Sequence, residues 1–308
     1  MRLSLAGLSV LALLMAAPAP QPALVAEVRA LIAADDFATA EIRLRDYRAV
    51  HGATSEAAAA FSWMARGALE RNRLDRALDY AARTRELVAE ALKGRGIDED
   101  RLLATALGAA IEVEAQTLAR RGELGAAMRL LEAELARYRG ATLHIRIQKN
   151  INLLSLVGKP APPLDLSQFL GRRPEPLAAQ KGHPVLLFFW AHWCPDCKAM
   201  APVLARLKSE YGPRGLKFYL PTTLYGYTKR GEEASQAEEL PYIAKVRNET
   251  YAALADDPLP VSEENMRVYG SSSVPTLVLI DRQGIVRLYH PGEMTYEELA
   301  PAVAALFP

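Results

Sequence analysis

Trp193-Cys194-Pro195-Asp196-Cys197 holds both cysteines of this 308-residue chain. Two thiols at C-x-x-C spacing can close a small ring with each other, as a redox pair requires. A framework of several disulfides is excluded, and so is a zinc site with four cysteine ligands from one chain. A metal site that uses the two thiols is the alternative, but the chain has no second cysteine pair and only five histidines.

The residues around the motif predict a strand that turns into a helix at the first cysteine. Residues 185–190 form a continuous apolar run, which is typical of a strand buried on both faces. Helical sequence follows over 195–211, and Pro195 suits the first turn, where a backbone N–H has no partner anyway. Cys194 is therefore expected at a helix N-terminus, where free N–H groups favour its thiolate. Cys197 is expected to be more buried and to act second.

Asp196 places a carboxylate between the two cysteines. It competes with the Cys194 thiolate for the same positive field, so it is expected to raise the pKa of the Cys194 thiol. A less stabilised thiolate makes the disulfide harder to reduce, and the reduced pair becomes the better electron donor. The motif therefore predicts a reductase rather than a strong oxidant.

The composition changes at Gly158, where glycine and several prolines end the preceding helical sequence. Beyond this point strands and helices alternate, which is typical of an α/β fold. Thr295 and Glu298 have the spacing of a capping box at the start of the last helix. Besides the strand over 185–190, the predicted elements are strands at 216–220, 275–280 and 285–289, a mostly helical segment over 221–266, and a helix over 295–306.

The preceding residues, 22–156, predict an all-α region. They are rich in Ala, Leu, Arg and Glu, which are strong helix formers, and proline is absent between Ala23 and Lys159. Helix openings are predicted at segments that begin with Asp36, Arg73 and Glu123. Their large apolar residues, Phe37, Leu74 and Leu124, are 37 and 50 residues apart. These spacings lie near the tetratricopeptide period of about 34 residues but are irregular. Helical hairpins resembling tetratricopeptide repeats are expected, with a plain helical bundle as the alternative.

The N-terminus predicts export from the cytoplasm. Arg2 is followed by an apolar run over 3–15 and then by small residues, the pattern of a secretory signal peptide. The run is shorter than the roughly 20 residues of a membrane span, so cleavage is favoured over an uncleaved anchor. A periplasmic or secreted location follows, where disulfides persist. The formal net charge of +1 gives no support for nucleic-acid binding.

The motif and its surroundings resemble the thioredoxin superfamily, which has a tryptophan directly before the first cysteine. The stretches 158–162, 181–187 and 274–284 resemble its TlpA/ResA-like periplasmic branch. The resemblance covers the chain from about residue 156 to 307 and implies an α/β thioredoxin fold, with a central mixed sheet flanked by helices. The expected domains are a signal peptide at 1–19, an all-α, tetratricopeptide-like domain at 20–156 and a thioredoxin-like domain at 157–308.

The resemblance also implies the activity, that of a thiol–disulfide oxidoreductase in which Cys194 and Cys197 are catalytic. It implies that the Val274–Pro275 peptide bond is cis and faces the cysteines, so that the Val274 backbone pairs with an extended substrate segment. The remaining motif and groove residues are Trp193, Pro195 and Asp196. The expected redox group is the Cys194–Cys197 disulfide alone, without a cofactor or metal. The expected partners are a protein disulfide substrate, an upstream thiol electron donor and a protein bound by the helical domain.

The sequence departs from the family at Phe188, where many thioredoxins carry a buried carboxylate. An acid or base for the resolving thiol must then be water or come from elsewhere, and the branch can use a glutamate of the inserted segment. The candidates are Glu232, Glu233, Glu238 and Glu239. His192 is expected to be an exposed neighbour of the site.

Two other functions stay open. In one, the helical region is an adaptor that captures proteins for the thioredoxin module. In the other, the protein delivers copper with Cys194, Cys197 and either His192 or His290.

Overall fold

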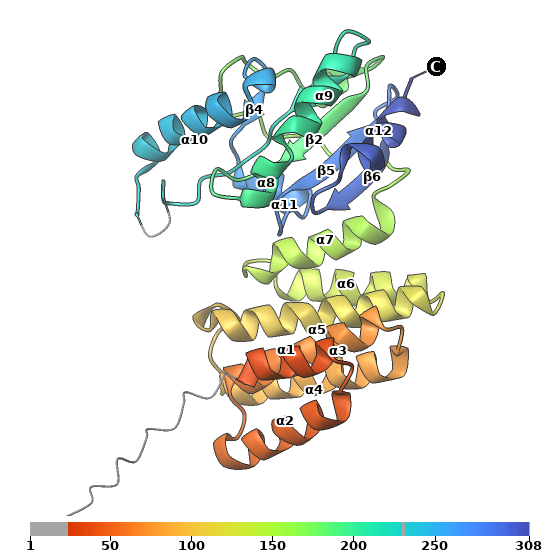
Figure 1. Ribbon diagram of the computed structural model, residues 1–308, viewed down its shortest axis with the longest axis vertical. Helices are drawn as coiled ribbons and strands as arrows, with labels where there is room; N and C mark the ends of the chain where they lie inside the picture. Colours follow the sequence, from red (N-terminus) through yellow and green to blue (C-terminus); the bar gives the residue numbers. More distant parts are fainter. Residues whose placement is uncertain (1–23, 230–231, 308) are drawn as a thin grey trace, which may run out of the picture.

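The computed structural model describes residues 24–229 and 232–307. It has two parts: a helical half, residues 24–155, and a sheet half, residues 156–307, with α7 lying between the other helices and the sheet (Figure 1). The predicted signal peptide lies outside the described residues, and the division into domains stays a prediction. The helical half contains α1 (Leu24–Ala33), α2 (Phe37–His51), α3 (Ser55–Glu70), α4 (Leu74–Leu92), a 3-10 turn (Ile97–Glu99), α5 (Arg101–Arg120), α6 (Leu124–Arg137) and α7 (Leu143–Ser155).

The predicted helix openings at Asp36, Arg73 and Glu123 are the N-cap residues of α2, α4 and α6, which begin one residue later. Asp36 caps α2, because its side chain accepts a hydrogen bond from the backbone N–H of Thr39. The all-α prediction is confirmed, whereas the likeness to tetratricopeptide repeats stays a prediction.

One helix of the described residues, α5, is long and apolar enough to cross a membrane. It packs against α3, α4, α6 and α7, and it supplies core residues such as Leu103, Leu107 and Ile111. α5 is therefore the central helix of the helical half, and its apolar side chains pack in the core of that half.

The sheet half is built around a four-stranded mixed sheet in the order β3-β2-β5-β6. β2 is parallel to β3 and antiparallel to β5, and β5 is antiparallel to β6. A separate two-stranded ladder joins β1 and β4. The elements are β1 (Phe169–Leu170), β2 (Val185–Phe189), α8 (Pro195–Ala199), α9 (Ala201–Tyr211), β3 (Lys217–Tyr219), α10 (Gln236–Thr250), β4 (Leu259–Pro260), α11 (Glu263–Val268), β5 (Thr276–Ile280), β6 (Val286–Pro291) and α12 (Tyr296–Ala304), with 3-10 turns at Leu177–Gln180 and Ala252–Leu254.

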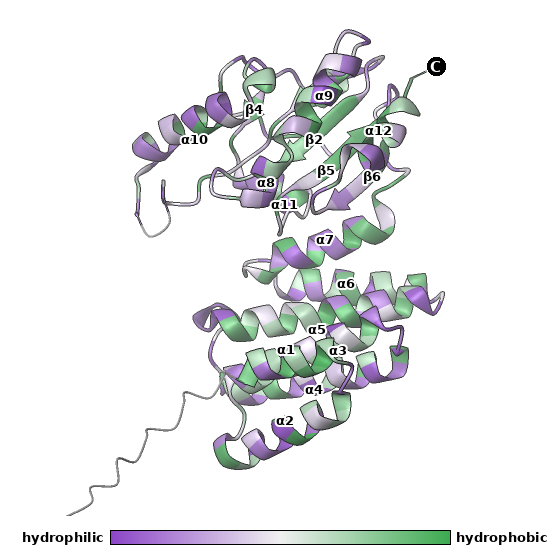
Figure 2. Ribbon diagram, viewed as in Figure 1, coloured by the Kyte–Doolittle hydropathy of each residue, from purple (hydrophilic) through white to green (hydrophobic). Residues whose placement is uncertain are grey.

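The central strand β2 is buried on both faces, as its apolar run predicts. Successive side chains of a strand point to opposite faces. Leu186 and Phe188 pack with the helices α8, α9 and α12, whereas Leu187 and Phe189 pack with Tyr269 and other residues on the opposite face. The hydrophobic colouring in Figure 2 follows β2 and β5 accordingly. The predicted mixed sheet flanked by helices is confirmed.

Two predictions about helices were wrong in part. The helix predicted over 195–211 is divided at Met200, because Pro202 has no N–H to donate and its ring disfavours a continuous helix. The segment over 221–266 is less helical than predicted. Its first residues are extended instead: Thr222 donates its backbone N–H to Pro260 O at 3.0 Å and bridges to Val261, so helix begins only at α10.

The two halves meet at α7. Asn152 of α7 donates a side-chain hydrogen bond to Val268 O at 3.2 Å. Gly270, with a φ of +61°, lies against the α7 backbone. A Cβ at this residue would stand 2.3 Å from the backbone nitrogen of Lys149. The loop after α11 is therefore in direct contact with the helical half.

Candidate active site

Cys194 is the N-cap of α8, at the point where the chain leaves β2 and enters the helix. Pro195 is the first helical residue, as predicted. The backbone N–H of Cys197 donates to Cys194 Sγ at 3.0 Å. A donor in this position stabilises a thiolate on Cys194 more than a thiol, since the thiolate is the stronger acceptor.

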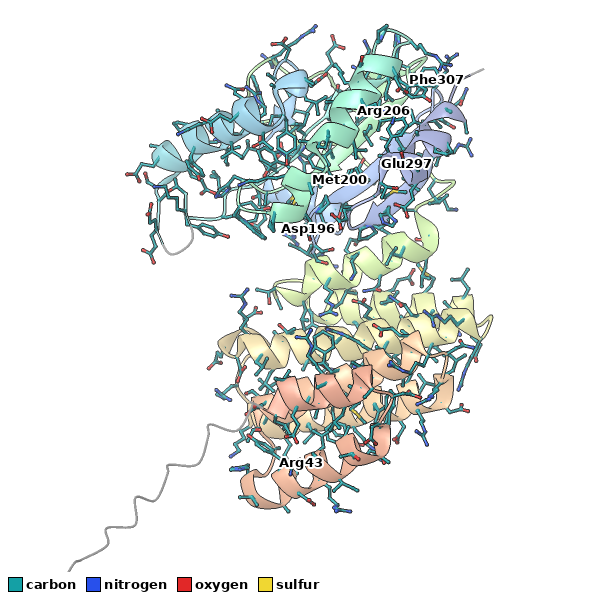
Figure 3. All side chains as sticks on the ribbon, in the orientation of Figure 1. Arg43, Asp196, Met200, Arg206, Glu297 and Phe307 are labelled. Atoms are coloured by element: carbon teal, nitrogen blue, oxygen red, sulfur yellow. A yellow bond between two sulfur atoms is a disulfide. The ribbon has the colours of Figure 1, made fainter. Side chains whose placement is uncertain are left out.

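Cys194 and Cys197 form a disulfide, with their Cα atoms 5.3 Å apart. Both residues are buried: Cys194 is 2% exposed and Cys197 is 0% exposed. Cys197 is thus the more buried, as predicted, by a small margin. Trp193 is 42% exposed, and Pro195 is exposed as well, so the motif presents these side chains to solvent around the buried disulfide. Asp196 is also exposed, at the end of the sheet half nearer to α7 in Figure 3.

The peptide bond between Val274 and Pro275 is cis, as the family resemblance implies. Cys194 Sγ lies 3.4 Å from the carbonyl oxygen of Val274. The carbonyl oxygen of Ser273, one residue earlier, accepts a hydrogen bond from Thr276 Oγ1 at 2.8 Å, which holds the turn. The loop before β5 and the first cysteine are therefore in contact, although 80 residues separate them in the sequence.

The expectation of an exposed His192 was wrong, because this residue is only 1% exposed. Its ring lies among those of Tyr225, Tyr227 and Tyr242, with centroids 5.5 to 5.6 Å away. Burial lowers the pKa of His192, and the nearby Glu239 opposes this shift without cancelling it. The side chain is therefore mostly neutral at pH 7.

Glu239 is the buried member of the four candidate glutamates, at 1% exposed. Its carboxylate accepts the backbone N–H groups of Tyr225 at 2.6 Å and Gly226 at 2.8 Å, and Oε1 lies 3.9 Å from His192 Nδ1. The carboxylate thus holds Tyr225 and Gly226 against α10, beside His192, which directly precedes Trp193 of the motif.

The other three glutamates are exposed. Glu238 forms a capping box with Ser235 at the start of α10, and a carboxylate oxygen of Glu232 lies 3.9 Å from Lys229 Nζ. Phe188 is buried, and its ring meets that of Tyr251 edge-on at 5.6 Å. The strand below the motif therefore carries an aromatic side chain in place of the family's carboxylate.

The residues of the copper-delivery alternative do not form a metal cluster. Across residues 24–229 and 232–307, no three His, Cys, Asp or Glu side chains lie close enough together to hold a metal ion. His192 is enclosed by the tyrosines, and His290 pairs across the sheet with Leu277.

Known proteins match the sheet half. A family model for a thioredoxin-like domain matches residues 176–307. The thioredoxin-like protein YneN of Bacillus subtilis is 28% identical over 142 residues, which are 46% of this chain and 75% of the relative. The thiol:disulfide interchange protein DsbE of Pseudomonas aeruginosa is 32% identical over 158 residues, 48% of this chain and 75% of the relative. The thiol-disulfide oxidoreductase ResA of Bacillus thuringiensis is 27% identical over 152 residues, 49% of this chain and 79% of the relative.

These matches agree with the mixed sheet, with the disulfide at the start of α8 and with the cis-proline loop beside it. The chain is therefore a member of the thioredoxin-like family of thiol–disulfide oxidoreductases that includes DsbE and ResA.

Proposed function

We propose that this protein is an extracytoplasmic reductase of protein disulfides. One observation carries the disulfide-exchange chemistry of this proposal: Cys194 Sγ accepts the N–H of Cys197 at 3.0 Å and lies 3.4 Å from the carbonyl oxygen of Val274. The first contact stabilises the attacking thiolate. The second places that sulfur beside the backbone that would hold the substrate.

The reduced enzyme transfers two electrons in two exchange steps. The Cys194 thiolate attacks one sulfur of the substrate disulfide, forms a mixed disulfide and releases the other substrate sulfur as a thiolate. The Cys197 thiolate then attacks Cys194 Sγ, which releases the second substrate sulfur and closes the Cys194–Cys197 disulfide. The two released thiolates take up protons from water. An upstream dithiol donor reduces the enzyme again, so that no cofactor takes part.

The substrate segment binds in an extended conformation against the loop that contains Val274 and Pro275. Pairing of its backbone with Val274 is the strand-addition mode of peptide recognition. Exposed Trp193 forms part of the surface around the disulfide. The helical half supplies a further contact surface for a protein partner.

The direction of electron flow follows from Asp196. Its exposed carboxylate disfavours the Cys194 thiolate and so favours the disulfide over the dithiol. A redox titration of the full-length protein against dithiothreitol tests this. We expect a potential closer to that of thioredoxin, about −270 mV, than to that of the oxidant DsbA, about −120 mV. A value near −120 mV would contradict the reductase proposal.

Trapping tests the roles of the two cysteines. A Cys197→Ser variant retains the attacking thiol but cannot resolve the mixed disulfide, so it is expected to accumulate covalent adducts with extracytoplasmic proteins. Cys194→Ser is the matched control and should form none through this route. Adducts that form equally with both variants, or with neither, would refute the assignment of Cys194 as nucleophile.

A further inference from the structure

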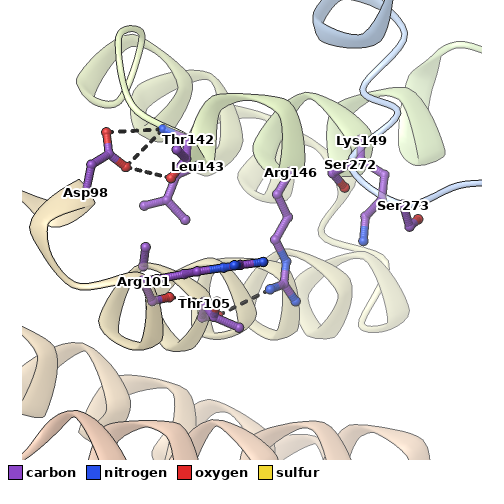
Figure 4. A pocket seen from close by; sticks show the side chains of 10 residues that line it. Asp98, Arg101, Thr105, Thr142, Leu143, Arg146, Lys149, Ser272 and Ser273 are labelled. Carbon is purple, nitrogen blue, oxygen red and sulfur yellow. Dashed lines mark hydrogen bonds between the residues drawn. The ribbon is translucent and has the colours of Figure 1, made fainter. Parts of the chain in front are cut away.

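A cleft of about 730 Å³ lies where the two halves meet. Its floor comes from α5 and α7, and one end is closed by Ser272 and Ser273 of the loop before the cis-proline (Figure 4). In this view Arg101 and Arg146 extend into the space between the two helices, and Lys149 points down beside the two serines. Polar side chains from both halves therefore line one cavity.

Positive charge predominates in this cleft. Arg146 Nε and Lys149 Nζ both lie 2.9 Å from the same oxygen of Glu112. Burial lowers the pKa of Lys149, and the neighbouring Arg146 adds to the effect in spite of Glu112. One carboxylate thus serves two cations.

The two other charged residues of the cleft, Arg101 and Asp98, do not neutralise the positive charge of Arg146 and Lys149. Arg101 is exposed, and no carboxylate of the described chain forms an ion pair with it. Asp98, at the far end of the cleft, already accepts hydrogen bonds from the backbone N–H and the hydroxyl of Thr142, at 3.1 and 2.6 Å. The three cations of the lining therefore face two carboxylates that are both engaged. The cleft offers unused N–H donors to an anion.

The cleft begins next to the redox site. Ser273 directly precedes Val274, whose carbonyl oxygen is 3.4 Å from Cys194 Sγ. An extended chain advances about 3.3 Å per residue, so a segment paired with Val274 reaches the cleft within a few residues. The contact of Gly270 with the α7 backbone fixes the loop relative to Lys149. The distance between the cleft and the disulfide is therefore set by the fold.

We propose that this cationic cleft binds acidic side chains that flank the reacting cysteine of the protein substrate. The inference rests on the proposed function and names the class of substrate. Arginine and serine donors suit carboxylates, and the guanidinium group binds a carboxylate through two parallel hydrogen bonds. The cleft thus makes the helical half part of the substrate site.

Two synthetic peptides test the proposal with the full-length protein. Each contains one internal disulfide, and they differ only in two glutamates or two glutamines placed a few residues from one cysteine. We expect the reduced enzyme to favour the acidic peptide by about fivefold in kcat/KM at low salt, the range of one or two partly exposed ion pairs. Raising the salt to about 0.5 M should remove most of this preference, because it screens exposed charges.

An Arg101→Glu variant tests the cleft itself. Arg101 is the first residue of α5, where an acidic side chain suits the helix dipole, so the variant should fold. We expect the ratio between acidic and neutral peptides to fall to one or below. Arg76→Glu, an exposed position on α4, makes the same charge change outside the cleft and should leave the ratio as it is.

The outcomes separate this inference from the proposed function. Reduction of both peptides at equal rates, unchanged by Arg101→Glu, would overturn the inference and leave the reductase intact. A cysteine-free acidic peptide, followed by fluorescence anisotropy, tests binding without the chemistry. Binding that weakens in Arg101→Glu, together with reduction of neither peptide, would support the cleft and refute the reductase. Failure of this peptide to bind the unmodified protein would count against the cleft.

Discussion

The two halves of the molecule are built from different side chains. The core of the helical half is rich in alanine, and α3 alone buries Ala57, Ala58, Ala59 and Ala60. The core of the sheet half contains large aromatic residues, among them Phe188, Phe189, Trp190 and Tyr269. Small side chains let helices approach closely, whereas a sheet covered by helices needs volume between its layers. Both halves bury apolar surface, with small side chains between the helices of one half and large side chains between the sheet and helices of the other.

The halves also differ in where they bury charge. In the helical half, charged groups join helices: Arg85 pairs with Glu114 at 2.9 Å and with Glu134 at 2.8 Å. In the sheet half, the buried pair of His192 and Glu239 lies beside the redox motif. The sheet half also has a structural pair of this kind, Lys208 with Asp257 at 2.6 Å, but its buried Glu239 lies next to the redox motif. At the junction between the halves, Glu112 of α5 pairs with Arg146 and Lys149 of α7, and these two cations line the cleft beside the redox loop.

The largest expected effect comes from adding a side chain at Gly270, where the two halves are in direct contact. Gly270→Ala would force a Cβ against the α7 backbone and would strain a positive φ, so we expect a loss of roughly 3–4 kcal/mol in the free energy of unfolding. Urea denaturation measures it. The matched control is Gly284→Ala, which has a φ of +85° but open space around it and should lose only about 1–2 kcal/mol. Equal losses in the two variants would show that the contact contributes nothing.

The second largest effect is expected from removing the charge of Glu112, the carboxylate that pairs with Arg146 and Lys149 of the cleft. Burial alone would raise the pKa of Glu112, but Arg146 and Lys149 outweigh it and hold the pKa at about 2. Glu112→Gln leaves two cations without their partner and is expected to cost about 2–3 kcal/mol at pH 7. Glu86→Gln, exposed on α4, is the control.

The acid limb of the stability curve checks the same residue. The pKa of Glu112 is lower in the folded state, so its contribution is present above about pH 4.5 and is lost as the pH falls toward 2. Glu112→Gln should therefore flatten the pH dependence of stability in this range. A variant with the same slope as the unmodified protein would contradict the pairing.

A smaller effect is expected at His192, in the sheet half. Burial lowers its pKa from the usual 6.5, so the unfolded chain binds a proton more readily than the folded one. Stability is fully present above pH 6.5 and falls below it, by at most about 1 kcal/mol down to pH 5.5. His192→Gln should remove this part of the fall, and His51→Gln, at an exposed position, should not. Denaturation at pH 7.5 and 5.5 gives the comparison.

The smallest expected effect is at Asp196. Asp196→Asn removes the negative charge beside the thiolate, and we expect the redox potential to become more oxidising by on the order of 10–30 mV. The effect is small because the side chain is exposed and screened. Asp46→Asn, exposed on α2, should leave the potential unchanged. A shift toward a more reducing potential would reverse the reasoning on Asp196.

The sequence predicts those features that depend on neighbouring residues. The apolar run of β2, the helix openings at Arg73 and Glu123 and the capping box of Thr295 with Glu298 are all present in the structure. Each is determined within a few residues, by periodicity or by a cap. The cis peptide bond before Pro275 was predicted from the family resemblance and not from the neighbouring residues.

The features that depend on distant segments were missed. His192 is buried because a segment more than 30 residues later, with Tyr225 and Tyr227, folds over it. Residues 221 and 222 are extended because they pair near Val261, against their expected helical conformation. Glu239 could be separated from Glu238 by one signal only, since the capping box at Ser235 turns Glu238 outward. The cleft is lined by residues of α7 and by Ser272 and Ser273, which follow more than 120 residues later. No pattern of neighbouring residues predicts such a cleft.

The burial of Cys194, which is only 2% exposed, has a consequence for timing. Oxidation and alkylation of cysteine depend on access to the sulfur as well as on its ionisation. Small reagents in the surroundings, such as peroxides, therefore reach this sulfur slowly, whereas a docked protein delivers its disulfide directly to it. We therefore expect the oxidation state of the enzyme to depend more on its encounters with partner proteins than on small oxidants in the medium.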